Sequence, residues 1–283
     1  MKILDGKELA GFIKERQFSE NFGLGSGGPS FGLGDSNSAG FSRRPKLLII
    51  RDSENPVILK YVKLKIRYGE DIGVSVEDFY AKNSEEIREK ILAANSDAEI
   101  DGIILQLPIL EKEKTDELTS LIAPEKDVDG LSGAGKFESA TATAILWLLA
   151  GYDISLNETN VALVGRGKLV GRPLLKMFKN SGVNVSLFHR GDDLTELKNF
   201  DIIITATGVP GLIKSEMVKP GAVVVDAGTA SEKGILVGDV SEEVRARNDL
   251  KAITPKVGGV GPLTVTCLFE HVIQAYNSYA KKS

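Results

Sequence analysis

Short apolar runs alternate with stretches of helical periodicity through most of the chain. The runs are rich in Val, Ile and Leu and contain few polar residues, which predicts buried strands. The predicted strands are Lys46–Arg51, Val74–Tyr80, Gly102–Leu107, Val161–Gly165, Val183–Phe188, Ile202–Ala206 and Ala222–Asp226. The predicted helices are Pro56–Ile72, Ser84–Ala94, Thr115–Ile122, Thr141–Ala150, Val170–Asn180 and Leu263–Ala280. Because buried strands separated by helices form parallel sheets covered on both faces, the predicted fold class is α/β.

A change of composition divides this series near residue 140. Residues 123–144 are rich in small and polar side chains, and a new strand–glycine turn–helix unit begins at Val161. We therefore expect a first domain over residues 1–140, a second over residues 141–262, and a C-terminal helix over residues 263–283 that packs back on the first domain. Two α/β lobes leave a cleft between them, which is the usual place for a ligand.

One segment breaks the alternation. Residues 18–42 contain seven Gly and six Ser, and the sequence FGLG occurs twice within them. This composition is typical of a flexible loop or insertion. A phosphate-binding loop is the alternative, but neither a preceding strand nor a following Lys-Ser/Thr pair supports it.

Composition and charge narrow the function classes. Of the 283 residues 42% are hydrophobic, no apolar stretch is long enough to cross a membrane, and the net charge of −4 disfavours nucleic acid as a partner. A single cysteine (Cys267) and two distant histidines (His189 and His271) make a metal site or an intrachain disulfide improbable. We expect a cytoplasmic protein without a metal ion.

A glycine-rich turn follows the strand that begins at Val161. Gly165, Gly167 and Gly171 are spaced GxGxxxG, and a helix comes directly after them. In this context backbone amides and a helix N-terminus can hold the pyrophosphate of a dinucleotide. A purely structural tight turn is the alternative.

The next strand tip bears on which dinucleotide binds. NAD-binding sites usually present a carboxylate there to the ribose hydroxyls. Here His189 and Arg190 follow the strand, and Arg166 lies in the glycine turn. Guanidinium groups pair well with a 2′-phosphate, so NADP is favoured over NAD. Asp192 and Asp193 lie just beyond and leave NAD open.

The helix after the first long strand carries a candidate acid/base group. Tyr61 and Lys65 are four residues apart and share a face that an apolar stripe borders. Desolvation beside apolar neighbours lowers the pKa of a lysine and makes it usable in proton transfer. A solvated basic face with an extended lysine side chain is the simpler alternative.

Three further segments could face a ligand. Gln106, followed by Leu107 and Pro108, ends a buried strand, at the edge where parallel sheets bind ligands. The sequence KDVDG at 126–130 could present a carboxylate, or it could be a solvated loop. The glycine loop at 256–264 could approach a flat ligand closely, or it could be a hinge.

Taken together, the motifs point to one family. They are ILDGK at 3–7, YVKLK at 61–65, DGIILQLP at 101–108, KDVDG at 126–130, VGRGKLVGRP at 164–173, KPGAVVVDAG at 219–228, LVGDV at 236–240 and GGVGPLT at 258–264. In this order the chain resembles the bifunctional methylenetetrahydrofolate dehydrogenase/methenyltetrahydrofolate cyclohydrolase family over nearly all its length outside residues 18–42.

The resemblance implies a fold and two reactions. The expected protein is a homodimer, with a folate-binding N-terminal lobe and an NADP-binding Rossmann lobe in each chain. It oxidises methylenetetrahydrofolate to methenyltetrahydrofolate and then hydrolyses the product to 10-formyltetrahydrofolate. By matching position, Lys65 is the acid/base group of hydrolysis and Gln106 its hydrogen-bonding partner. Tyr61 packs against the folate, and Asp129 binds the amino edge of the pterin.

The resemblance also assigns the binding residues. The cofactor-binding residues it implies are Gly165, Arg166, Gly167, Lys168, Gly171, His189, Arg190, Thr207, Gly208 and Thr229. The substrate-binding residues it implies, besides Tyr61, Lys65, Gln106 and Asp129, are Leu107, Pro108, Gly258, Gly259, Gly261, Pro262 and Thr264. The chain departs from the family pattern at Ile58, where a serine is common, and in several loops near these residues. A protein with only one of the two activities, or one that binds folate or NADP without turnover, is therefore the alternative. A short-chain dehydrogenase is disfavoured because its Tyr-x-x-x-Lys pair follows the dinucleotide turn, whereas Tyr61 and Lys65 precede it.

Overall fold

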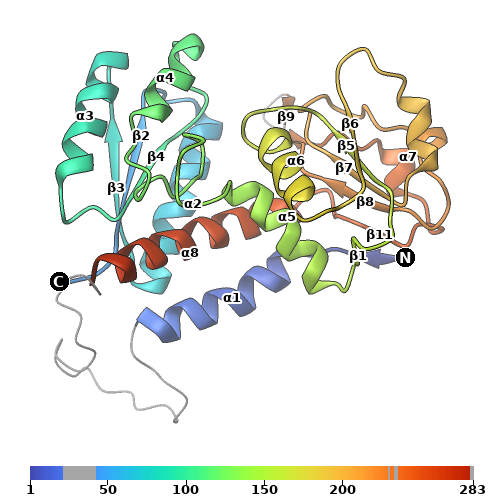
Figure 1. The fold of residues 1–283 in the computed structure, drawn as a ribbon, viewed down its shortest axis with the longest axis horizontal. Helices are drawn as coiled ribbons and strands as arrows, with labels where there is room; N and C mark the ends of the chain where they lie inside the picture. Colours follow the sequence, from blue (N-terminus) through green and yellow to red (C-terminus); the bar gives the residue numbers. More distant parts are fainter. Residues whose placement is uncertain (22–42, 229, 233–234, 281–283) are drawn as a thin grey trace. The chain divides into compact units, whose positions relative to one another are not determined.

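A computed structural model describes residues 1–21, 43–228, 230–232 and 235–280 (Figure 1). The chain forms two compact units. Unit 1 comprises residues 1–10 and 141–264, and unit 2 comprises the described residues of 11–140 and 265–283. Two long helices, α1 (Gly6–Asn21) and α8 (Val260–Ala280), contribute residues to both units.

Unit 1 is built on a six-stranded sheet in the order β1-β11-β8-β7-β5-β6, in which every neighbouring pair is parallel. Its strands are β1 (Lys2–Ile3), β5 (Val161–Val164), β6 (Val185–Phe188), β7 (Ile202–Thr205), β8 (Val223–Asp226) and β11 (Ala252–Ile253). An antiparallel hairpin of β9 (Ala230–Glu232) and β10 (Ile235–Val237) accompanies it. Its other helical segments are α5 (Ala140–Gly151), α6 (Gly171–Asn180), η2 (Leu194–Asn199), η3 (Ser215–Met217) and α7 (Glu242–Arg245).

The order of the strands fixes where unit 1 can bind a ligand. Strands β5 and β7 are buried along their whole length, as the apolar sequences VALV and IIIT require. The chain runs from β5 through α6 to β6 on one side of β5, and then returns to β7 on the other side. Ligands of open parallel sheets bind at such a reversal, beyond the carboxyl ends of the two strands.

Unit 2 repeats this plan on a smaller sheet. Its strands are β2 (Lys46–Arg51), β3 (Ser75–Tyr80) and β4 (Gly102–Leu105), in the parallel order β3-β2-β4. Its helical segments are α2 (Pro56–Ile72), α3 (Ser84–Ser96), η1 (Lys112–Lys114) and α4 (Thr115–Ser120). Residues Leu48 and Ile50 of β2 pack with apolar side chains of α3 and α4. The strand order reverses between β2 and β4, which marks a second ligand-binding edge.

Local sequence explains where α2, the helix that carries Tyr61 and Lys65, begins and ends. The side chain of Asn55 accepts a hydrogen bond from the backbone N–H of Val57 at 2.9 Å and caps α2, and Pro56 occupies its first turn. At the other end Gly73 adopts a left-handed conformation with φ of 77° and ends the helix. Helix α2 is therefore fixed at both ends, and it holds Tyr61 and Lys65 in one register.

The α/β class and the parallel sheets are confirmed. All seven predicted strands are present, with ends shorter by up to two residues. Strands β1, β9, β10 and β11 were not predicted because two or three residues carry no readable periodicity. None of the described helices is long and apolar enough to cross a membrane.

The N-terminal segment differs from expectation. Residues 1–10 were expected in the first domain, yet β1 pairs with β11 and joins the sheet of unit 1. Helix α1 was not predicted. Its last turn, Phe18–Asn21, belongs to the segment that was expected to be flexible, so for these four residues that expectation is wrong. Asn21 anchors that turn by donating a hydrogen bond to the carbonyl of Ile72 at 2.9 Å. The rest of the Gly/Ser-rich segment lies outside the described residues.

Candidate functional site

Lys65 and Gln106 meet at the reversal edge of unit 2. Lys65 comes from α2, and Gln106 directly follows β4. The Nζ of Lys65 donates a hydrogen bond to Oε1 of Gln106 at 2.6 Å, and both residues are half-buried. Lys60 and Lys63 of the same helix are exposed. Lys65 is thus not part of a solvated basic face, which was the simpler alternative.

Backbone contacts fix the orientation of the Gln106 side chain. Its Nε2 donates a hydrogen bond to the carbonyl of Leu107 at 3.2 Å, and its own N–H bonds the carbonyl of Ile50 in β2 at 2.8 Å. Since the amide nitrogen is already engaged, the amide oxygen is the end that faces Lys65.

The loop that carries Asp129 is held by buried charges. Lys126 is 3% exposed and donates to the carbonyls of Ala94 and Asp97, at 2.8 and 2.6 Å. Asp127 is fully buried and accepts hydrogen bonds from the backbone N–H groups of Leu131 and Ser132. The solvated loop considered for residues 126–130 is therefore wrong. These two side chains hold the loop, which leaves Asp129 as the carboxylate not used in building it.

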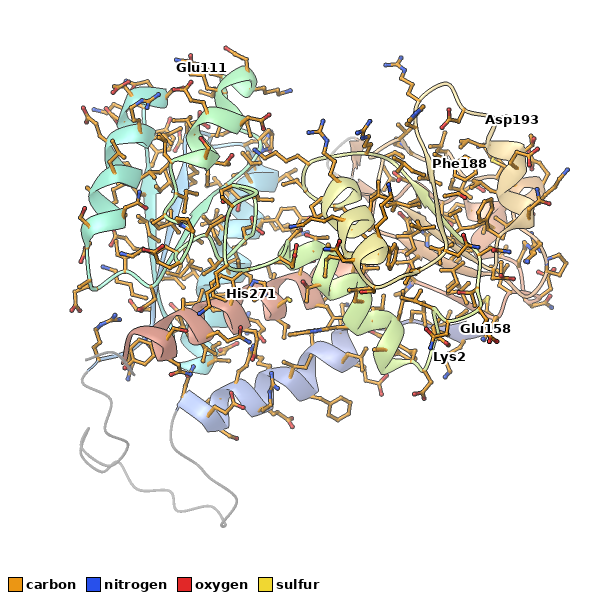
Figure 2. All side chains as sticks on the ribbon, in the orientation of Figure 1. Lys2, Glu111, Glu158, Phe188, Asp193 and His271 are labelled. Carbon is orange, nitrogen blue, oxygen red and sulfur yellow. The ribbon has the colours of Figure 1, made fainter. Side chains whose placement is uncertain are left out.

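A histidine of α8 supports the same loop. His271, labelled in Figure 2, lies on α8. Its Nδ1 lies 2.8 Å from the carbonyl oxygen of Val128, and its ring stacks on Phe137 at 4.8 Å between centroids. The carbonyl can only accept, so Nδ1 carries the proton. This contact fixes the backbone one residue before Asp129.

Burial shifts the titration of both charged groups. Desolvation lowers the pKa of Lys65, and the negative charge of Asp129 opposes that shift. Desolvation likewise raises the pKa of Asp129, and the positive charge of Lys65 opposes it. Burial also raises the pKa of Tyr61, which lies one turn before Lys65 and is half-buried. Each shift favours the neutral form of its group, and for Lys65 the lowered pKa favours the form that can accept a proton.

Asp52, which we did not predict from the sequence, helps to shape this edge. It follows β2, is 3% exposed, and accepts a hydrogen bond from the N–H of Leu110 at 2.9 Å. It thereby ties the turn that contains the half-buried Leu107 and the exposed Pro108 to the end of the central strand. A single aspartate after a strand gave no signal in the sequence.

In unit 1 the glycine turn lies at the other reversal edge. A Cβ atom at Gly171 would lie 2.1 Å from the carbonyl oxygen of Gly165, and Gly165 itself has a φ of 110°. Both positions therefore require glycine. A Cβ at Gly167 would meet no atom within 4 Å. Arg166 is exposed beside Gly167, whereas Lys168 is half-buried.

The strand tip after β6 is occupied by its own contacts. The carboxylate of Asp192 accepts a hydrogen bond from the N–H of His189 at 2.7 Å, and it lies 3.1 Å from Nδ1 of the same residue. Asp193 accepts hydrogen bonds from the N–H and hydroxyl of Thr195. Arg190 is exposed. The two carboxylates that left NAD open are thus engaged within the turn.

The remaining candidates lie in unit 1. Thr207 and Gly208 follow β7, Gly208 has a φ of 70°, and Thr229 lies outside the described residues. Gly258 and Gly259 pack on the ILDGK segment, since the N–H of Gly6 bonds the carbonyl of Gly258 at 2.9 Å. The first two turns of α8 contain Gly261, Pro262 and Thr264. The glycine loop thus has a packing role that the sequence did not reveal.

Two family models match the chain. A model of the tetrahydrofolate dehydrogenase/cyclohydrolase catalytic domain matches residues 4–129, and a model of the NAD(P)-binding domain of the same family matches residues 139–280. The chain belongs to the tetrahydrofolate dehydrogenase/cyclohydrolase family. The resemblance inferred from its motifs is confirmed.

Relatives of this family match along nearly the whole chain. The bifunctional protein FolD of Hydrogenobaculum sp. is 37% identical over 98% of this chain and 99% of its own length. The FolD of Aquifex aeolicus is 38% identical over 97% of this chain and 94% of its own. A crystal structure of the bifunctional enzyme FolD from Campylobacter jejuni has a TM-score of 0.85 at 32% identity and covers 99% of both chains. FolD of Trypanosoma brucei, complexed with NADP and an inhibitor, has a TM-score of 0.85 at 27% identity and covers 98% of this chain and 97% of its own.

Proposed function

We propose that this protein is a bifunctional enzyme of one-carbon folate metabolism. In the first reaction 5,10-methylenetetrahydrofolate transfers a hydride to NADP and becomes the 5,10-methenyl cation. In the second, water adds to that cation, one carbon–nitrogen bond of the ring breaks, and 10-formyltetrahydrofolate and a proton result. Family membership and the retained polar residues support both activities over a protein with one activity or none.

One observation carries the proposal of catalysis. The half-buried Lys65 donates its hydrogen bond to a glutamine whose amide is fixed by the backbone, at 2.6 Å. A lysine held in this way, with a lowered pKa, can exchange a proton with a reacting water or ring nitrogen. A surface lysine would remain a spectator cation.

The other residues of unit 2 take supporting roles. We assign Tyr61 to packing against the folate ring, because its ring lies one turn from Lys65 and is half exposed. We assign Asp129 to the amino edge of the pterin, where a carboxylate can accept two hydrogen bonds. Leu107 and Pro108 line the same strand end. Water is the second substrate, so Lys65 receives the proton of the attacking water and returns it as the ring opens.

The residues of unit 1 fit NADP. Gly165 and Gly171 bring the backbone of the turn close to the N-terminus of α6, which favours a pyrophosphate. The missing side chain of Gly167 leaves room for a phosphate to approach. Arg166 and Arg190 are exposed cations suited to a 2′-phosphate. The bound NADP accepts the hydride, and the protein supplies its orientation.

These assignments define the roles of the two parts of the chain. We propose that unit 2 binds the folate and that unit 1 binds NADP. From the family resemblance we also propose a homodimer, which light scattering of the purified protein at several concentrations would test. The cytoplasmic location expected from the sequence stays a prediction.

A spectrophotometric assay tests the function. The protein is mixed with methylenetetrahydrofolate and NADP, then with NAD, and separately with methenyltetrahydrofolate alone. We expect reduction of NADP and a faster loss of methenyl absorbance than in buffer. Turnover of one substrate only would indicate a monofunctional enzyme. Binding of folate and NADP without turnover would indicate a non-catalytic relative.

A further inference from the structure

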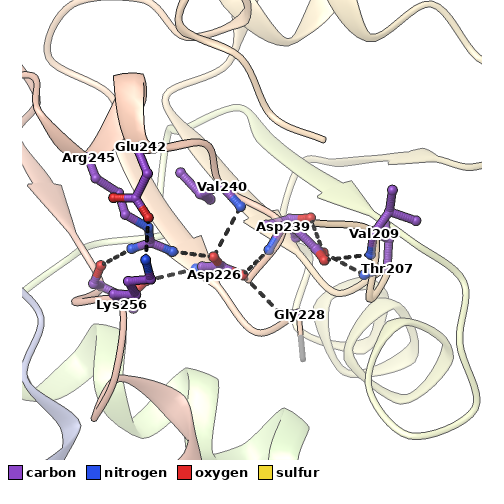
Figure 3. A network of polar contacts seen from close by, with 11 residues as sticks. Thr207, Val209, Asp226, Gly228, Asp239, Val240, Glu242, Arg245 and Lys256 are labelled. Atoms are coloured by element: carbon purple, nitrogen blue, oxygen red, sulfur yellow. Dashed lines mark hydrogen bonds and ion pairs between the residues drawn. The ribbon is translucent and has the colours of Figure 1, made fainter. Parts of the chain in front are cut away.

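Asp239 of unit 1 has a fully buried carboxylate, which is bonded to the turn after β7, at the edge where the strand order reverses. Asp239 is 0% exposed and comes after β10 in the LVGDV motif. Its Oδ2 accepts hydrogen bonds from the hydroxyl of Thr205 and the N–H of Thr207, both at 2.6 Å, and its Oδ1 accepts from the N–H of Val209 at 3.0 Å (Figure 3). These bonds join Asp239 to the turn after β7 on both sides of Gly208.

That turn is in contact with the glycine turn. A Cβ atom at Gly165 would lie 2.6 Å from the carbonyl oxygen of Ala206 and 3.2 Å from the side chain of Thr207. The glycine turn and residues 206–207 therefore form one surface, at the carboxyl ends of β5 and β7. A displacement of the 205–209 turn would change the surface on which a dinucleotide rests.

A second carboxylate fixes Asp239 in turn. Asp226, at the end of β8, accepts hydrogen bonds from the backbone N–H groups of Asp239 and Val240, each at 3.1 Å, and pairs with Arg245. A Cβ at Gly228 would lie 2.1 Å from the carboxylate of Asp239, and a Cβ at Gly238 would lie 2.0 Å from that of Asp226. Each carboxylate therefore lies against glycine backbone, at a point where a side chain on that glycine would collide with it.

We propose that Asp239 is a positioning residue for NADP, which holds the Thr207–Val209 turn against the glycine turn in the shape that the dinucleotide needs. The proposal rests on the proposed NADP-dependent function. Asp239 itself does not touch the reacting atoms. Two of its three side-chain bonds go to the Thr207–Val209 turn and the third goes to Thr205, the last residue of β7, so its loss acts first on that turn.

The proposal predicts a separation of kinetic effects. In Asp239→Asn one acceptor oxygen becomes an NH₂ donor, so at least one N–H or hydroxyl loses its bond to residue 239. The N–H of Val209 would keep its second bond, to Oγ1 of Thr207 at 3.1 Å. We expect the KM for NADP to rise about tenfold. The kcat of the dehydrogenase and the cyclohydrolase activity, which depends on unit 2, should stay within about twofold of the wild-type values.

Two variants complete the experiment. Asp249→Asn is the matched control, because Asp249 is an exposed carboxylate of unit 1 that pairs with Arg247. It should leave the KM for NADP unchanged. Thr205→Val removes one of the three donors to Asp239 and keeps the other two, so it should raise the KM by a smaller factor. It also keeps the proposal testable if Asp239→Asn fails to fold.

The outcomes separate the proposal from its alternatives. A selective rise in the KM for NADP, seen also as weaker NADP binding by fluorescence, supports the positioning role. An unchanged KM overturns it, as does an equal loss of both activities with a lower melting temperature, because that pattern indicates a merely structural role. If the wild-type protein neither binds NADP nor oxidises methylenetetrahydrofolate, the proposed function itself has failed, whatever the variants show.

Discussion

The two sheet edges at which the strand order reverses have the same strand arrangement but carry different chemical groups. In unit 2, the edge between β2 and β4 carries side chains that titrate, namely Lys65 with Gln106 beside it and Asp129 in electrostatic contact. In unit 1, the edge between β5 and β7 consists of the glycine turn and of the Thr207–Val209 turn, which Asp239 holds by hydrogen bonds. In the proposed function, the first edge transfers protons and the second binds NADP.

The half-buried Asp129 of unit 2 differs from the two carboxylates that support the cofactor edge of unit 1. Asp226 and Asp239 are bonded to backbone N–H groups, a hydroxyl and an arginine of their own unit, so their charges are used in construction. Asp129 instead interacts electrostatically with Lys65, and the positive charge of Lys65 opposes the rise in the pKa of Asp129. A buried acid whose partners are structural keeps a loop in place. A buried acid beside a titratable base is available for chemistry.

The largest effect is expected from a variant that removes the titratable amine of Lys65 in unit 2. Lys65→Met keeps the length and apolar stem of the side chain but cannot transfer a proton. We expect cyclohydrolase activity to fall by about 100- to 10,000-fold, with the fold intact by circular dichroism. Lys63→Met, an exposed lysine on the same helix, is the control and should keep full activity. Hydrolysis at the wild-type rate in Lys65→Met would remove Lys65 from its assigned role.

The second prediction concerns the glycine turn of unit 1 and its choice of cofactor. Arg166→Ala removes an exposed guanidinium from the glycine turn, and we expect the KM for NADP to rise about tenfold or more while the KM for NAD changes little. Arg190→Ala should act in the same direction. Lys198→Ala, an exposed cation of η2 in the same unit, serves as the control. Equal changes for both cofactors would refute the assignment to the 2′-phosphate.

The sequence, together with the family resemblance, predicted the pairing of Lys65 with Gln106 in unit 2, but not the residues that support either site. Lys65 and Gln106 could be found because residue type, helical spacing and a buried strand end coincide at them. Asp239 and Asp52 could not, because their roles depend on hydrogen-bond donors that only folding brings near. These donors are 30 to 34 residues away for Asp239 and 58 for Asp52. Short strands such as β1 and β11 were missed for the same reason, since two residues acquire their pairing only from the sheet.

A smaller effect concerns the coupling between the charges of unit 2. The negative charge of Asp129 raises the pKa of Lys65, against the larger lowering by burial. In Asp129→Asn that support is lost, so the pKa of Lys65 falls further. We expect the acidic limb of the pH profile of kcat for hydrolysis to move to lower pH, measured at saturating folate with the uncatalysed rate subtracted. Glu125→Gln, an exposed acid of the same loop, should not move it. A shift to higher pH would contradict the coupling.

The smallest effect tests whether the Asp129 loop is held by a neutral histidine. Burial lowers the pKa of His271, and the carbonyl of Val128 opposes that shift only in part. Below its ordinary pKa of 6.5 the unfolded chain therefore binds a proton that the folded protein does not. Stability attributable to His271 is complete above pH 6.5 and falls with acidification, by at most about 1.4 kcal/mol per pH unit.

Replacement of this histidine should flatten that dependence. His271→Gln can still donate a hydrogen bond to Val128 but cannot titrate, so the melting temperature should fall less steeply between pH 6.5 and the lowered pKa. An unaltered slope in His271→Gln would mean that the histidine already takes up a proton in the folded state. In that case the negative charges of Glu270 and Asp127, which raise the pKa of His271, would outweigh the burial of its ring.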